Sequence, residues 1–104
     1  MSFSRNSRNI HLEGDATLVA ECERAGGRGF ANSTLNLNTC LGNIDGSFKW
    51  GQTDYSLTAL NVRLEGTVLK ARLQRAESAA EFKESQVNLD DHIENHNGQL
   101  RYTP

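Results

Sequence analysis

Short runs of alternating apolar and polar residues recur along the first half of the chain. The apolar positions of these runs are Ile10 and Leu12, then Leu18, Ala20 and Cys22, then Leu35 and Leu37. The second half has the same pattern at Val62 and Leu64, at Leu69, Ala71 and Leu73, and at Val87 and Leu89. A period of two is typical of β-strands that bury one face. The pattern predicts an all-β protein with three strands in each half, whose equivalent faces point inward.

An internal repeat explains the likeness of the two halves. Asn9–Gly14 (NIHLEG) aligns with Asn61–Gly66 (NVRLEG) at an offset of 52 residues, and most of the remaining chain follows the same alignment. A repeat of this length with three strands buries little surface alone. We therefore predict one domain over residues 1–104, with repeats at approximately 1–52 and 53–104 that share one core. The segment Trp50–Tyr55 between them has the character of a hinge through which two chains could exchange halves.

Each half also contains the signature of a β-hairpin. The dipeptides Asp45-Gly46 and Asn97-Gly98 accept the positive φ angles of a two-residue type I′ turn. Strands over 47–50 and 99–102 are expected to follow. Just before the hairpins, the segments 38–41 and 90–93 begin with Asn38 and Asp90, which are capping residues and predict a single helical or 3-10 turn.

The composition suits a folded globular protein, with 37% hydrophobic and 23% charged residues among 104. The net charge is −2 and the basic residues are scattered, so we expect no nucleic-acid partner. No apolar stretch approaches the roughly 20 residues of a membrane helix, and the first residues lack the apolar run of a signal peptide. We expect a cytoplasmic protein without membrane insertion; secretion by a non-classical route stays open.

The two cysteines, Cys22 and Cys40, are flanked by apolar or small residues rather than arranged as Cys-x-x-Cys. We predict two buried thiols, with a disulfide and a metal site as the alternatives. His92 and His96 have the spacing of a zinc-binding helix, but the Asn97-Gly98 turn breaks any helix there. We therefore expect no metal.

The sequence contains no recognisable catalytic motif. Asp90 and Asp91 are neighbours on one turn, whereas a glycosidase needs two carboxyl groups that face a bond across a cleft. No nucleophile-elbow, Cys-His or phosphate-loop pattern is present. The sequence predicts neither an enzyme nor a cofactor.

Three segments resemble the cyanovirin-N homology family of mannose-binding lectins, including its fungal members: 22–24 (CER), 43–50 (NIDGSFKW) and 87–95 (VNLDDHIEN). The resemblance covers nearly the whole chain. It implies two pseudo-symmetric halves, each with a triple-stranded antiparallel sheet and a β-hairpin, with strands exchanged between the repeats. It also implies non-catalytic binding of terminal Manα1-2Man on high-mannose oligosaccharides or glycoproteins, by a monomer that can form a domain-swapped dimer.

The chain departs from the family at the disulfides of cyanovirin-N. Ser7 stands where the partner of Cys22 would be, and Ala59 and Leu73 replace the second pair. Neither family disulfide can therefore form, and apolar packing is expected between Ala59 and Leu73.

The resemblance also implies two carbohydrate sites, carried over position by position. The first consists of Arg5, Asn6, Glu23, Arg24, Ala25, Asn95, His96 and Asn97. The second consists of Gly42, Asn43, Ile44, Asp45, Thr53, Asp54, Thr58, Gln74, Arg75 and Ala76. Amide and carboxylate groups suit a sugar because each hydroxyl both donates and accepts. At these sites the chain departs from the family, which has a threonine at Ala25, an aspartate at Asn97, and glutamates at Gly42 and Leu57. The loops 25–29 and 75–81 are also longer than those of the family.

Simpler interpretations exist for these residues. Turn geometry alone can explain Asn43, Asp45, Asn95 and Asn97. Trp50 and Tyr102 occupy equivalent repeat positions, which favours core packing over sugar stacking, and the role of Tyr55 stays open. The alternative to a lectin is an intracellular protein-interaction scaffold that kept the fold and lost the sugar pocket.

Overall fold

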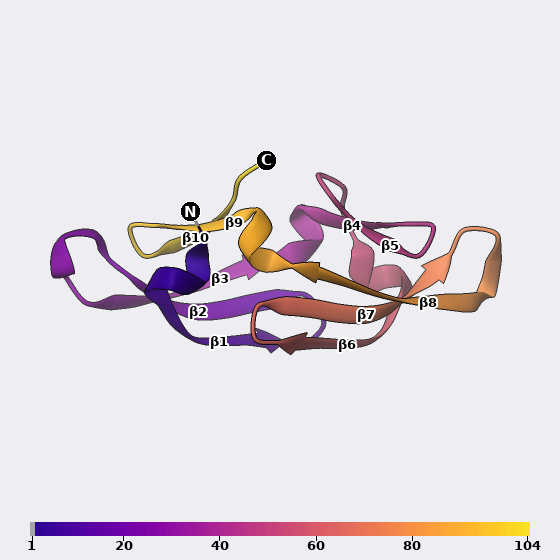
Figure 1. The fold of residues 1–104 in the computed structure, drawn as a ribbon, viewed down its shortest axis with the longest axis horizontal. Helices are drawn as coiled ribbons and strands as arrows, with labels where there is room; N and C mark the ends of the chain where they lie inside the picture. Colours follow the sequence, from indigo (N-terminus) through magenta and orange to yellow (C-terminus); the bar gives the residue numbers. More distant parts are fainter. Residues whose placement is uncertain (1) are drawn as a thin grey trace.

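The computed structural model describes residues 2–104 and is built mainly of antiparallel strands (Figure 1). The first three-stranded sheet contains β1 (Ser7–Glu13), β2 (Thr17–Glu23) and β3 (Phe30–Asn36) in that order. The second contains β6 (Ala59–Glu65), β7 (Val68–Arg75) and β8 (Ser78–Asn88) in the equivalent order. The predicted all-β architecture is confirmed.

Two hairpins complete the fold. One pairs β4 (Leu41–Ile44) with β5 (Ser47–Trp50), and the other pairs β9 (Ile93–His96) with β10 (Gln99–Tyr102). In both hairpins, the two turn residues have positive φ. The angle is 50° at Asp45 and 88° at Gly46, and it is 52° at Asn97 and 92° at Gly98. The type I′ prediction is confirmed.

Each hairpin packs on the sheet of the other sequence half. The Leu100 N–H on β10 donates to Ser33 Oγ on β3 (2.9 Å), and the Ser85 hydroxyl on β8 donates to the Gly46 carbonyl. Figure 1 shows the hairpin β9–β10 beside β3 at one end, and β4–β5 near β8 at the other. The molecule is elongated, with extents of 50 × 23 × 16 Å. The exchange of strands between the repeats, which the resemblance implied, is confirmed.

Residues 2–104 contain five 3-10 turns: η1 (Phe3–Asn6), which precedes β1, and η2 (Ala25–Gly27), η3 (Leu37–Thr39), η4 (Tyr55–Thr58) and η5 (Leu89–Asp91) between strands. The turns predicted before the hairpins exist as η3 and η5, but their caps were wrongly assigned. The side chains of Asn36 and Asn88 accept from the N–H groups of Asn38 and Asp90, at 3.0 Å each. An Asx oxygen reaches the N–H two residues further on, so each cap lies two residues earlier than predicted.

The segment 75–81, which the resemblance presents as a longer loop, is mostly strand. Ala76 and Glu77 form a tight turn, and β8 already begins at Ser78. A register shift between Gln74 and Arg75 accommodates the additional residues within the β7–β8 pairing.

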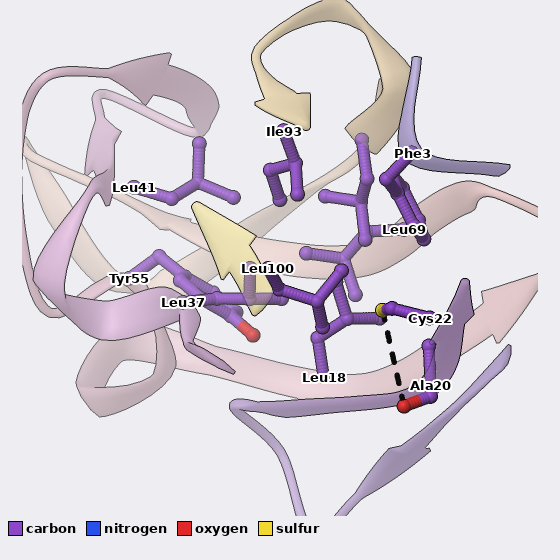
Figure 2. Packing of buried hydrophobic residues seen from close by; sticks show 11 residues of the cluster. Phe3, Leu18, Ala20, Cys22, Leu37, Leu41, Tyr55, Leu69, Ile93 and Leu100 are labelled. Atoms are coloured by element: carbon purple, nitrogen blue, oxygen red, sulfur yellow. Dashed lines mark hydrogen bonds between the residues drawn. The ribbon is translucent and has the colours of Figure 1, made fainter. Parts of the chain in front are cut away.

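Side chains from both sequence halves form one buried cluster (Figure 2). Leu18 and Leu37 from the first half pack with Leu69, Ile93 and Leu100 from the second. No helix within residues 2–104 has the length and apolar character to cross a membrane.

Both cysteines are free and buried, as predicted. The Cys22 thiol lies against the Ala20 carbonyl (4.0 Å; Figure 2). Ser7 is the cross-strand partner of Cys22, and Ala59 is the partner of Leu73. The strand register therefore places these residues opposite each other, at the positions of the two disulfides in cyanovirin-N that the resemblance implied.

The aromatic residues whose roles were open are used for packing. Trp50 stacks on Tyr102 with ring centroids 5.7 Å apart and an interplanar angle of 11°, and Trp50 also packs against the core. Tyr55 is fully buried, and its hydroxyl donates to the Asp15 carbonyl. The His92 ring packs on Trp50 at 5.0 Å. Within residues 2–104, no group of three or more His, Cys, Asp or Glu side chains is arranged to hold a metal ion.

Candidate functional site

Two small polar pockets lie in equivalent places in the two structural halves. The first pocket has a volume of about 250 Å³ and is lined by Asn6, Glu23, Arg24, Ala25, Gly26, Gly27, Asn95 and Asn97. The second pocket has a volume of about 260 Å³ and is lined by Asn43, Asp45, Thr58, Gln74, Arg75, Ala76 and Ala79. Each pocket combines a hairpin from one sequence half with strand ends from the other.

Asn95 on β9 holds the first pocket together. Its Oδ1 accepts from the Gly98 N–H (2.8 Å), which closes the hairpin turn. Its Nδ2 donates to the carbonyls of Glu23 (2.9 Å) and Asn6 (3.4 Å). Both amide hydrogens of Asn95 are thereby engaged with the protein's own backbone, so this side chain positions the pocket walls.

Asn97 adds a second connection across the same pocket. Its Oδ1 accepts from the Ala25 N–H (3.0 Å), which fixes the loop after β2 against the hairpin turn. Gly98 permits this close approach because a Cβ at that position would lie 3.1 Å from Arg24 Cγ and 3.3 Å from Ala31 Cβ.

The second pocket has the same arrangement, formed by hairpin residues that lie 52 positions earlier in the sequence. Asn43 Oδ1 accepts from the Gly46 N–H (2.8 Å), and Asn43 Nδ2 donates to the Gln74 carbonyl and to Thr58 Oγ1 (2.9 Å each). Asp45 Oδ1 accepts from the Ala76 N–H (3.1 Å), as Asn97 does from Ala25. The rigid parts of the two pockets are therefore equivalent.

The charged groups distinguish the two pockets. In the first, the exposed side chains of Glu23 and Arg24 have no hydrogen bond or ion pair with any other described residue. In the second, Arg75 pairs with Asp45 (Nη2 to Oδ2, 3.4 Å) and Gln74 Nε2 donates to the Ala79 carbonyl (3.1 Å). The Ala76 N–H and then the Arg75 guanidinium lower the pKa of Asp45 below its ordinary value. The first pocket thus offers a carboxylate and a guanidinium that are available to a ligand.

Comparison with known proteins identifies the family. A family model described as the CVNH domain matches residues 3–101. The chain belongs to the cyanovirin-N homology family. A cyanovirin-N homolog from Tuber borchii is 37% identical over 103 residues, which cover 96% of this chain and 97% of that protein. Members of this family are carbohydrate-binding lectins and not enzymes.

Solved structures of the family have the same fold. The Gibberella zeae CVNH structure is 37% identical with a TM-score of 0.88, and covers 98% of this chain and 97% of its own. Microvirin in complex with mannobiose is 29% identical with a TM-score of 0.83 and covers 97% of both chains. A MoCVNH3 variant in complex with (N-GlcNAc)4 is 28% identical with a TM-score of 0.87, covering 96% of this chain and 95% of its own.

Most residues predicted for the first site of this family member meet in the first pocket. Arg5 and His96 do not line it: Arg5 is exposed on η1, and His96 lies 3.1 Å from Glu94. Gly26 and Gly27 line the pocket and were missed. The glycine-rich loop after Arg24 is the signal that could have indicated them, because both adopt positive φ.

A smaller share of the residues predicted for the second site comes together. Gly42, Ile44, Thr53 and Asp54 lie outside the lining of the second pocket, and Ala79 lines it without having been predicted. Gly42 is buried and forms a β-bridge with Asp54, where an added Cβ would lie 2.5 Å from Gln52 Cβ. Gly42 therefore has a packing role at this position.

Proposed function

We propose that this cyanovirin-N homolog binds terminal Manα1-2Man of high-mannose glycans without catalysis, and that the first pocket is the stronger site. The observation that carries this proposal is the unengaged pair Glu23 and Arg24 on a rim that Asn95 and Asn97 hold rigid. A carboxylate accepts from neighbouring hydroxyls and a guanidinium donates to them, so together they match both roles of a sugar hydroxyl.

The size of the first pocket supports recognition of a glycan end. Its volume of about 250 Å³ is smaller than the roughly 300–1,000 Å³ of sites for larger ligands. The mannobiose bound by microvirin favours a mannose disaccharide, while the (N-GlcNAc)4 bound by the MoCVNH3 variant provides the competing sugar for a test.

The second pocket is the weaker site in this proposal. A sugar there has to displace Arg75 from Asp45 and Gln74 from the Ala79 carbonyl before it gains their hydrogen bonds. These contacts are exposed and each is worth little, so we expect a second site that is weaker by several-fold and still measurable. Two working sites in opposite halves of a monomer could bridge glycan arms and raise avidity.

The test is a titration of isotope-labelled protein with Manα1-2Man, in which backbone amide signals are assigned to each pocket. We expect shifts at Glu23, Arg24 and Ala25 at lower sugar concentration than at Gln74 and Ala76. The matched variants Arg24→Ala and Arg75→Ala separate the two sites. Loss of hydrogen bonds from a charged group predicts about tenfold weaker binding at the first pocket for Arg24→Ala, and little change there for Arg75→Ala.

Each alternative outcome has a distinct meaning. Shifts with (GlcNAc)4 but not with Manα1-2Man would refute mannose specificity and retain a lectin. Equal affinities of the two pockets would refute the ranking. No shift at millimolar Manα1-2Man and no binding on a broad glycan array would refute the proposal and favour the protein-interaction scaffold.

A further inference from the structure

Ser4 and Asp90, which line neither pocket, connect two distant segments of the chain. The Ser4 N–H donates to Asp90 Oδ1 (3.1 Å), and the Ser4 hydroxyl donates to Asp90 Oδ2 (2.5 Å), across a separation of 86 residues. Ser4 lies in η1, whose last residue, Asn6, lines the first pocket. Asp90 lies in η5, which precedes the strand that carries Asn95. The Ser4–Asp90 pair therefore connects the two segments that carry Asn6 and Asn95, without lining the pocket itself.

An equivalent pair lies beside the second pocket, with an amide in place of the carboxylate. The Ser56 N–H donates to Asn38 Oδ1 (3.1 Å), and Asn38 Nδ2 donates to Ser56 Oγ (2.6 Å). Ser56 follows Ser4, and Asn38 precedes Asp90, by the same offset in the repeat alignment. Turn η4 ends at Thr58, which lines the second pocket. In both pairs, the backbone N–H and the hydroxyl of the serine are engaged, although the partner is a carboxylate in one pair and an amide in the other.

The 3-10 turns η1 and η4 are also held in the same way at their first residue. Each begins with a fully buried aromatic residue, Phe3 in η1 and Tyr55 in η4. The aromatic ring fixes one end of the turn in the core, but the pocket residue lies three positions further on. The serine pair connects the intervening backbone to the neighbouring turn, so it helps to hold Asn6 and Thr58 at the pocket walls.

We propose that Asp90 is a positioning residue for the first pocket. It holds η1 so that Asn6 completes the pocket wall and its carbonyl stays within reach of Asn95 Nδ2. This inference rests on the proposed function, because a preorganised wall matters only if the pocket binds a ligand. When the binding-competent arrangement is less populated, the apparent dissociation constant rises in proportion.

The first pocket depends on its pair more than the second does. The residue before η4 is held by further contacts, because the Asp54 N–H donates to the Asn38 carbonyl (2.9 Å) and Asp54 forms a β-bridge with Gly42. Within residues 2–104, the segment before η1 has no equivalent backbone bond to η5. Loss of the Asp90 carboxylate therefore frees η1 more than loss of the Asn38 amide frees η4.

The test compares Asp90→Ala, Asp90→Asn and Asn38→Ala in the titration with Manα1-2Man. We expect Asp90→Ala to weaken binding at the first pocket by about three- to tenfold and to leave the second pocket unchanged. Asp90→Asn should restore most of the affinity, because the Asn38 amide engages the equivalent two groups of Ser56, with the serine hydroxyl as acceptor instead of donor. Asn38→Ala should weaken only the second pocket, and by a smaller factor.

A second measurement isolates the positioning role in the absence of sugar. Amide hydrogen exchange at 4–6 should accelerate in Asp90→Ala and stay close to the wild-type rate in Asp90→Asn. Wild-type binding with an unchanged first pocket in Asp90→Ala would overturn this inference alone. Equal losses in Asp90→Asn and Asp90→Ala would also overturn it, because the negative charge would then be the cause. Failure of the wild-type protein to bind would refute the proposed function itself.

Discussion

Replacing Tyr55 by phenylalanine removes one hydroxyl from the centre of the molecule. Tyr55 is the largest fully buried side chain among the described residues, and its hydroxyl donates to the Asp15 carbonyl, 40 residues away in sequence. Burial raises the pKa of Tyr55 well above its ordinary value, so the hydroxyl remains a donor throughout the neutral range. The substitution therefore tests a single neutral hydrogen bond between η4 and the β1–β2 turn.

The expected cost follows from the surroundings of the two partners. A hydrogen bond of this kind contributes a net ~0.5–1.5 kcal/mol, and more when a buried partner is left unsatisfied. Asp15 is exposed, so water can solvate its carbonyl after the hydroxyl is removed. The ring itself should remain in place, because Phe3 fills the equivalent position in the other half without a hydroxyl. We expect Tyr55→Phe to lower the free energy of unfolding by about 1 kcal/mol.

Urea unfolding followed by Trp50 fluorescence provides the assay, since Trp50 is the only tryptophan in the sequence. Tyr55→Ala is the size control, and the cavity it leaves should cost about 3–5 kcal/mol. An unchanged m-value would show that the unfolded states are comparable. A loss above about 3 kcal/mol for Tyr55→Phe would refute the reasoning that water replaces the hydroxyl. No loss at all would show that the bond contributes no net stability.

Three further changes test the turns and strands. Gly98→Ala should cost about 1–3 kcal/mol more than Gly66→Ala in urea unfolding, because both glycines have positive φ but only Gly98 has close neighbours. Equal costs would refute the close approach. Ser7→Cys should form a disulfide with its strand partner Cys22 and stabilise the protein by about 3 kcal/mol, detected as a rise in Tm that a reductant abolishes. The pKa of Asp45 is lowered in the folded state, so its carboxylate stabilises the fold above the unfolded pKa of about 3.9 and loses this effect as the pH falls through the folded pKa. Asp45→Asn should therefore lose less stability than the wild type between about pH 5 and pH 3, and an identical pH profile would contradict this.

The local elements depend on interactions that the sequence displays directly. Strands β5 and β10 lie at the predicted residues because Asp45-Gly46 and Asn97-Gly98 fix the turn type, and the turn type fixes the strand register. The alternation of apolar residues likewise identifies the buried faces at Leu18 and Leu69. These features involve residues that are close in sequence, so the pattern suffices.

The site was predictable in part, and mainly through the family resemblance. The positions of Glu23 and Arg24 follow from a matched motif, but the motif does not show whether their side chains are free. Asn95 was expected to offer its amide to a sugar, whereas the structure uses both amide hydrogens for backbone carbonyls. Hydrogen bonding between segments 72 and 89 residues apart cannot be inferred from spacing.

The sequence by itself determined the pattern of strands, the two hairpin turns, the repeat and the family. The tertiary structure alone decided which groups are already paired: Asp45 with Arg75 in the second pocket, and Ser4 with Asp90 behind the first. The physical reason is that the repeats have equivalent inward faces, so the hydrophobic pattern does not specify which sheet each hairpin covers. Only the packed arrangement brings the polar side chains of the two halves together and thereby distinguishes the two pockets.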